Sequence, residues 1–87
     1  MVNRAQQHLA IGDIAGARLF LERGVAKSDG RAALLLGGTY DPLWLKEKGA
    51  QGVAADQDKA RANYVRARDL GVAEAAVLMR RLEAARR

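Results

Sequence analysis

Residues 52–71 read GVAADQDKARANYVRARDLG and contain a helix start, an amphipathic body and a helix stop in one uninterrupted run. Asp56 is placed to accept hydrogen bonds from the free N–H groups of a first turn, and Asp58 adds negative charge near the positive end of the helix dipole. Gly71 can adopt the left-handed conformation that closes a last turn. Between these signals the apolar residues recur at spacings of three and four, at Ala60, Tyr64, Ala67 and Leu70. The stretch therefore predicts an amphipathic helix that starts at Asp56 and ends near Leu70.

A second apolar stripe follows at once, at positions i, i+3, i+4 and i+7, and consists of Ala75, Leu78, Met79 and Leu82. Two helices joined by so short a turn pack antiparallel. A shift of the chain by 43 positions places Ala17 on Ala60 and Leu35 on Leu78 without gaps, so the pattern occurs twice. A fixed period in this range is typical of stacked helical repeats. The sequence therefore predicts an all-α fold, an αα-superhelix of stacked antiparallel helix hairpins.

Residues 31–71 resemble the Sel1-like repeat, a relative of the tetratricopeptide repeats. The first helix of that pattern is matched by Ala33, Leu36, Gly37 and Tyr40, and the second by Gly52, Val53, Asp56, Lys59, Ala60, Tyr64, Ala67 and Gly71. The chain departs from the pattern at Asn63, where an aromatic residue is usual, at Arg66, where lysine is common, and in an insertion between Tyr40 and Gly52. The resemblance implies a right-handed superhelical scaffold that binds other proteins and has no catalytic residues.

The chain of 87 residues has the length of one small helical-repeat domain. We expect three parts, a first hairpin, a full repeat with an insertion, and a capping helix: residues 1–29, residues 31–71 with the insertion at 41–51, and residues 72–87. Solenoid units generally need neighbours at both ends to bury their faces. Either the chain is therefore part of a longer array, or its end helices pair with another copy and form a homo-oligomer.

Within the first hairpin, Asn3 and Asp13 are expected to cap two helices. The second of these should bury one stripe and turn another set of side chains to water, the stripe being Ile14, Ala17, Leu21 and Val25 and the outward set Arg18, Glu22 and Lys27. The next helix, from about Arg31 to Tyr40, should bury Ala32, Leu35, Leu36 and Thr39. Gly37 and Gly38 lie near its end and indicate close approach of a neighbouring helix rather than a phosphate cradle, because no Gly-x-Gly-x-x-Gly pattern follows a strand here.

The insertion begins with Asp41 and Pro42, a cap followed by the first helical position that proline favours. A short helix should follow and end before Gly49. Trp44 in this helix has two interpretations. It forms a lid over the open side of the hairpin, which we favour, or it is an exposed aromatic anchor for a partner.

The formal charge of +5 would favour an anionic partner if it were concentrated on one face. Arginines recur on every predicted helix instead, and their excess over lysine is expected of a GC-rich bacterial genome. We therefore favour solvated helix faces, and the terminal Arg80, Arg81, Arg86 and Arg87 also suit the negative end of a helix dipole. The alternative is a basic helical module that binds nucleic acid or another anionic partner through Arg61, Arg66, Arg68, Arg80 and Arg81.

Catalytic and metal-binding chemistry has little support in the sequence, which contains one histidine, one serine, one threonine and no cysteine. His8 has no second histidine or cysteine with which to bind a metal, so a structural or simply exposed position is expected. Asp56 and Asp58 do not share a helix face and are explained as capping residues. We therefore expect no enzymatic activity and no cofactor. No signal peptide is visible and no run of about 18 apolar residues occurs, so no membrane span is expected and the cytoplasm is the default location.

The function expected from these observations is a non-catalytic scaffold for protein–protein interaction, with a protein or peptide partner in the groove of the superhelix. The candidate partner-binding residues lie at or beside the insertion or replace a position of the repeat pattern: Tyr40, Trp44, Arg31 and Asn63. Tyr64 is expected in the core.

Overall fold

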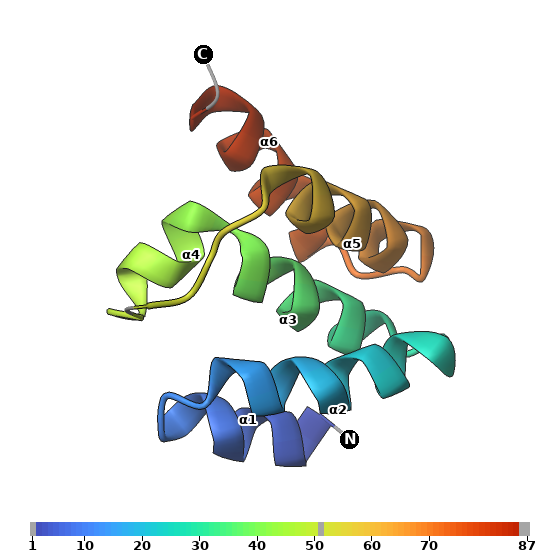
Figure 1. The fold of residues 1–87 in the computed structure, drawn as a ribbon. Coiled ribbons are helices and arrows are strands. Elements are labelled where there is room, and N and C mark those ends of the chain that lie inside the picture. Colours follow the sequence, from blue (N-terminus) through green and yellow to red (C-terminus); the bar gives the residue numbers. More distant parts are fainter. Residues whose placement is uncertain (1, 51, 86–87) are drawn as a thin grey trace.

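The computed structural model describes residues 2–50 and 52–85, and every regular element in this part of the chain is a helix. The helices are α1 (Val2–Ala10), α2 (Ile14–Ala26), α3 (Gly30–Tyr40), α4 (Pro42–Glu47), α5 (Gln57–Asp69) and α6 (Glu74–Ala85). Successive helices cross the molecule back and forth and form a flat body of 33 × 29 × 16 Å (Figure 1). The predicted all-α class is confirmed.

Aspartates begin four of the six described helices, because a carboxylate oxygen can accept the N–H groups that a first turn leaves free. Asp13, Asp29, Asp41 and Asp56 cap α2, α3, α4 and α5. The caps predicted at Asp13, Asp41 and Asp56 are thus confirmed, as is the left-handed conformation of Gly71, whose φ is 93°. The prediction that Asn3 caps α1 is wrong, because the helical conformation already includes Val2.

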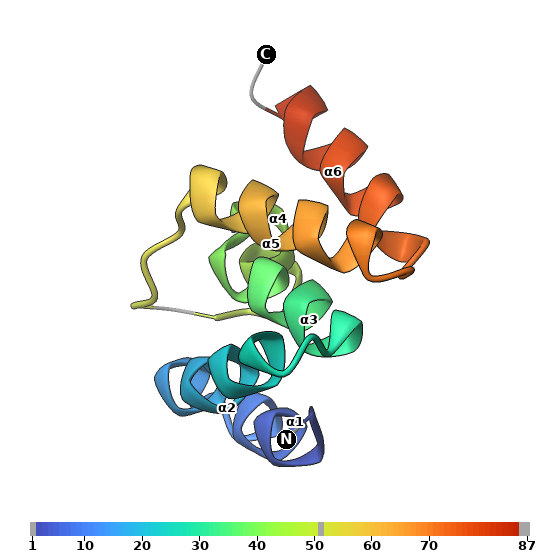
Figure 2. The same cartoon turned by 90° about the vertical axis from the view of Figure 1, so that its right-hand side faces the viewer.

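The helices pack in an order that makes α3 the central element. α1 packs on α2, α2 on α3, α3 on α5, and α5 on α6, while α4 packs on α3 (Figure 2). Because α2, α4 and α5 all cover α3, its buried residues are not confined to one stripe: Ala32, Ala33, Leu34, Leu36, Gly37, Gly38 and Thr39. The predicted one-sided stripe is therefore wrong in two places. It omitted Leu34, which is buried, and included Leu35, which is only partly buried.

Small residues let the helices around α3 approach closely. A Cβ atom added to Gly37 would lie 2.5 Å from Cδ1 of Tyr64, and one added to Gly38 would lie 3.0 Å from the Trp44 indole. The close approach predicted at this glycine pair is therefore confirmed. Tyr64 itself is fully buried, in a cluster with the apolar residues Ala33, Leu34, Ala60, Ala67, Ala75 and Leu82. Its position confirms the prediction that it belongs to the core.

A buried polar contact joins this core to α4. The Tyr64 hydroxyl donates a hydrogen bond of 2.7 Å to Oδ2 of Asp41. The other carboxylate oxygen, Oδ1, accepts the backbone N–H of Leu43 at 2.9 Å. Because Asp41 is 0% exposed, these partners replace the water that a carboxylate needs. The start of α4 is thus fixed to the core.

Arg18 lies in a helix interface, and the prediction that it faces water is wrong. Its Nε donates to the Thr39 hydroxyl at 3.2 Å, and its Nη2 donates to the backbone carbonyls of Thr39 and Ala54. The guanidinium also lies 3.9 Å from the centroid of the Tyr40 ring. The long side chain therefore ties α2 to the end of α3 and to the loop before α5.

The 43-residue shift found in the sequence relates two helices of the structure. The bounds of α2, residues 14–26, become residues 57–69 when 43 is added, and these are the bounds of α5. The caps Asp13 and Asp56 correspond in the same way, and the buried positions 17, 21 and 24 correspond to 60, 64 and 67. The correspondence does not extend to α1 and α4, since α1 packs on α2 but α4 packs on α3.

Candidate partner-binding hollow

A hollow of about 760 Å³ opens between α1, α3, α4 and α6. Apolar side chains make up much of its lining: Leu9, Ile14, Leu34, Leu35, Trp44, Val53 and Leu78. Charged side chains join them from α3, α4 and α6: Arg31, Glu47, Lys48, Glu74 and Arg81. The hollow therefore combines an apolar surface with charged groups of both signs.

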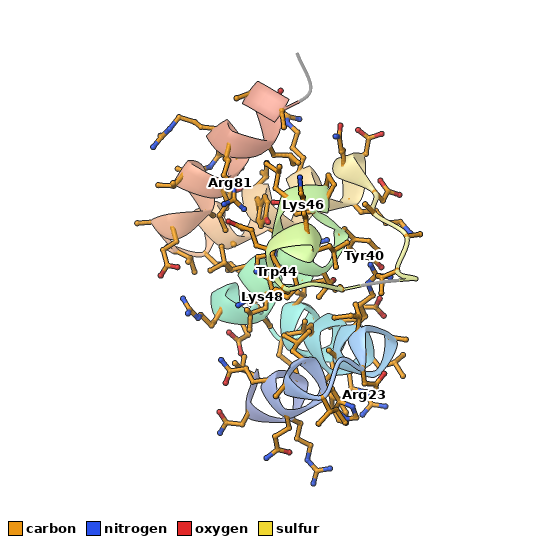
Figure 3. All side chains as sticks on the ribbon, turned by 90° about the vertical axis from the view of Figure 1, so that its left-hand side faces the viewer. Arg23, Tyr40, Trp44, Lys46, Lys48 and Arg81 are labelled. Atoms are coloured by element: carbon orange, nitrogen blue, oxygen red, sulfur yellow. The ribbon has the colours of Figure 1, made fainter. Side chains whose placement is uncertain are left out.

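Trp44 has one side against α3 and remains half-buried. Its indole lies over Gly38, where an added Cβ atom would lie 3.0 Å from the ring, closer than ordinary van der Waals contact. The ammonium of Lys48 lies 5.5 Å from the indole centroid, one helical turn further along the chain (Figure 3). The ring thus covers part of α3, as the lid interpretation requires, and it also lines the hollow, as the anchor interpretation requires.

Two ion pairs link the elements that surround the hollow. Nη1 of Arg31 on α3 lies 3.1 Å from Oε1 of Glu74 on α6, and Nη2 of Arg81 on α6 lies 3.0 Å from Oε1 of Glu47 on α4. The side chains in both pairs are between 37% and 67% exposed, so each pair contributes about 0–1 kcal/mol. Such weak links can rearrange when a ligand enters.

The structure brings two of the four predicted site residues together. Arg31 and Trp44 both line the hollow, whereas Tyr40 and Asn63 lie outside its described lining. Figure 3 shows Trp44 and Lys48 next to each other below Arg81, with Tyr40 toward the other edge of the molecule.

Tyr40 and Asn63 instead have local contacts. The Tyr40 ring lies close to two cations, with the Arg18 guanidinium 3.9 Å and the Lys59 ammonium 5.3 Å from its centroid. Its carbonyl oxygen accepts the backbone N–H of Asp56 at 2.9 Å. Asn63 donates from its side chain to the Lys59 carbonyl within α5, at 2.9 Å. These contacts connect neighbouring segments and account for both side chains without a ligand.

Sequence reasoning missed the other lining residues, Lys48, Arg81, Leu35 and Leu78 among them. A signal for the last two was present, because Leu35 falls on Leu78 under the 43-residue shift. Equivalent positions of two packed repeats line the same face, so this pair could have identified the face from the sequence alone. Lys48 and Arg81 had no such signal, since both line the hollow only because the chain around Glu47 lies within reach of α6.

His8 makes structural contacts. Its Nδ1 lies 2.7 Å from Oδ2 of Asp13, and its ring stacks on Phe20 with 5.2 Å between the centroids. The hydrogen bond from the Gly16 backbone N–H, and then the contact with His8, lower the pKa of Asp13. These contacts hold the end of α1 against the start of α2.

The arginines of the nucleic-acid alternative do not form one basic face. Arg61 pairs with Glu83 at 2.9 Å, Arg68 with Asp69 at 3.2 Å, and Arg81 with Glu47. Arg66 and Arg80 make no ion pair with another described residue. Arg68 and Arg80 border a smaller hollow of about 440 Å³ between α5 and α6. Arg81 instead lines the larger hollow. The side chains of Arg86 and Arg87 lie outside the described residues.

Among residues 2–50 and 52–85, no group of three histidine, cysteine or acidic side chains is placed to hold a metal ion. In the same part of the chain, none of the helices is both long enough and apolar enough to cross a bilayer. Comparison with protein-family models, with curated proteins and with solved structures gives no significant match.

Proposed function

We propose that this protein is a non-catalytic interaction module that holds a segment of a protein partner in the hollow between α1, α3, α4 and α6. The observation that carries the proposal is the lining, in which a half-buried tryptophan and several aliphatic side chains meet two weak ion pairs. A volume of about 760 Å³ lies within the range of sites that enclose a few side chains or a small ligand.

The energetics of protein recognition favour this use of Trp44. Tryptophan is enriched among the residues that contribute most to protein–protein binding, because a large ring loses much water-exposed apolar surface when a partner covers it. Trp44 is held in place by Gly38 behind it and by the Asp41 cap at the start of α4. A ring that is already oriented loses little conformational entropy on binding.

Stacking of Sel1-like hairpins into a superhelix is part of the same proposal. It is supported by the coincidence of the α2 and α5 bounds under the 43-residue shift and by the packing of successive helices on one another. Arg31 and Trp44 are the predicted partner-binding residues that this proposal keeps. Tyr40 and Asn63 stay predictions without a place in the hollow.

The test is affinity capture from a bacterial lysate with the wild type and Trp44→Ala as parallel baits. We expect a protein that the wild type retains at high salt and that Trp44→Ala loses. The matched control is Leu19→Ala, which removes a 61%-exposed apolar side chain of α2 outside the described lining and should retain the protein. Circular dichroism of each bait shows whether it is folded.

Two results would contradict the proposal. Nucleic acid bound by all baits and released as salt rises would favour the basic-module alternative, because phosphate contacts weaken steeply with salt. Equal recovery of every protein by the wild type and by folded Trp44→Ala would show that the hollow does not hold the partner.

A further inference from the structure

Lys48 is a cation of the hollow that has no acidic partner. Its ammonium lies over the Trp44 ring, and it forms no ion pair with any other described residue. The two acidic side chains of the lining are already paired, Glu74 with Arg31 and Glu47 with Arg81. The lining has three basic side chains and two acidic ones, so one positive charge is in excess. This charge is that of Lys48, beside the Trp44 ring.

Arg81 adds unused hydrogen-bond donors near the same end. Its Nη1 donates to Oε2 of Glu47 at 3.2 Å. Its Nη2 lies 3.0 Å from Oε1 of Glu47, but the direction does not make a hydrogen bond, and both Nη2 and Nε are enclosed without an acceptor among the described residues. Enclosed donors without acceptors are unfavourable, but an acceptor on a partner would reach these two only if the Arg81 side chain moved. Glu47 thus lies near two basic side chains, Lys48 and Arg81, that have more hydrogen-bond donors than the described residues have acceptors for them.

We propose that the partner segment carries an aspartate or glutamate one or two positions from an aliphatic anchor, and that Lys48 binds this carboxylate. The anchor packs between Trp44, Leu35 and Leu78, and the carboxylate lies beside the ammonium that is held over the Trp44 ring. This inference rests on the proposed function, because it concerns the occupant of the same hollow. The neighbouring Glu47 does not cancel the attraction, since Arg81 neutralises it.

Lys48 is exposed, so its contact with the carboxylate has the strength of a surface ion pair. The charge still distinguishes an acid from an amide, because only the ionised acid is attracted to it. A basic segment would instead meet the unpaired charge of Lys48 and be repelled. The excess charge of the hollow thus determines the sign of the partner's charge, while the apolar lining determines its anchor.

A library of short random peptides, displayed within a host protein so that no free C-terminus is present, is selected on the full chain and counter-selected on Trp44→Ala. We expect peptides in which aspartate or glutamate lies beside leucine, isoleucine or valine. One such peptide, synthesised with an amidated end, is then titrated against the variants. Lys48→Gln should weaken its binding about two- to fivefold. Replacing the peptide's acid by its amide should weaken wild-type binding to a similar extent, and Lys48→Gln binding much less.

Lys46→Gln is the matched control, since it removes the same charge from α4 outside the described lining. Equal losses from Lys46→Gln and Lys48→Gln would overturn the inference, as would selected peptides that need Trp44 but show no acidic preference. The proposed function would survive both results. A selection that gives no Trp44-dependent peptide would count against both.

Discussion

Removing the Tyr64 hydroxyl tests how much of the fold depends on one buried hydrogen bond. In Tyr64→Phe the ring remains and only the oxygen that donates to Asp41 is lost. Both side chains are 0% exposed, and the bond is 2.7 Å long. No water can therefore replace the hydroxyl without a rearrangement of the core.

The expected cost follows from the charge of the acceptor. A hydrogen bond to a charged group contributes about 1.5–3 kcal/mol, and a buried acceptor that loses a partner incurs its desolvation penalty. Asp41 keeps the backbone N–H of Leu43 on its other oxygen, which limits the loss. We expect Tyr64→Phe to lower the free energy of unfolding by about 2–3 kcal/mol. For a domain of this size that corresponds to a fall in Tm of about 8–24 °C.

Urea denaturation followed by circular dichroism measures this difference. Tyr40→Phe is the control, because the Tyr40 hydroxyl has no hydrogen-bond partner among the described residues while its ring keeps the contacts with Arg18 and Lys59. We expect the control to change stability by less than about 0.5 kcal/mol. If Tyr64→Phe unfolds at the same urea concentration as Tyr40→Phe, the bond does not contribute what its geometry indicates.

The pH dependence gives a second, independent measure. Burial, and then the hydrogen bond to Asp41, raise the pKa of Tyr64 above its ordinary value of about 10. The neutral side chain is therefore favoured in the folded state, and its contribution to stability is complete below pH 10. As pH rises above about 10 the unfolded chain ionises first, so the wild type should lose stability that Tyr64→Phe does not lose. Parallel stability curves for the two proteins above pH 10 would contradict this.

Two further perturbations test the packing of α3 and the cap of α2. Gly37→Ala should lower the free energy of unfolding by about 1–3 kcal/mol, because the new methyl group would lie 2.5 Å from a fully buried ring. Gly38→Ala should cost less in the same urea denaturation, since the atoms nearest to its new methyl group belong to the half-buried Trp44, at 3.0 Å. For Asp13, the lowered pKa means that its contribution is present above pH 3.8 and is lost as pH falls below that value. Asp13→Asn should therefore have a shallower decline in Tm below pH 4 than the wild type, and equal declines would refute this.

The sequence predicted helix starts and stops well because each depends on residues within one turn. Asp13, Asp41, Asp56 and Gly71 needed no knowledge of the neighbouring helices, and all four behave as predicted. Asn3 failed because the helical conformation extends past it to the N-terminal side.

Positions that depend on a neighbouring helix could not be predicted in this way. Arg18 lies beside the apolar stripe, as solvent-facing residues do, but its side chain reaches carbonyl groups on α3 and on the loop before α5. Periodicity describes one helix at a time, so it also gave α3 a single buried face. The central position of α3 between α2, α4 and α5 follows only from the packing.

The candidate site shows the same limit. Tyr40 and Trp44 were chosen because they lie at or beside the predicted insertion, but Trp44 lines the hollow and Tyr40 lies outside its described lining. The chain bends at Asp41, so that Trp44 returns over Gly38 while Tyr40 stays with Arg18. The sequence predicted that a new helix starts at Asp41, but it did not predict the direction of that helix relative to α3.

Asp41 determines that direction, and it connects the core of the protein to the candidate site. One carboxylate oxygen begins α4, and the other accepts the Tyr64 hydroxyl from the centre of the core. α4 is therefore not loosely attached, although it has only six residues and is too short to be stable alone. Its placement brings Trp44 and Lys48 to one side of the hollow and Glu47 within reach of Arg81. The chemistry that we assign to the hollow thus depends on a short helix whose start is fixed by a buried hydrogen bond to the core.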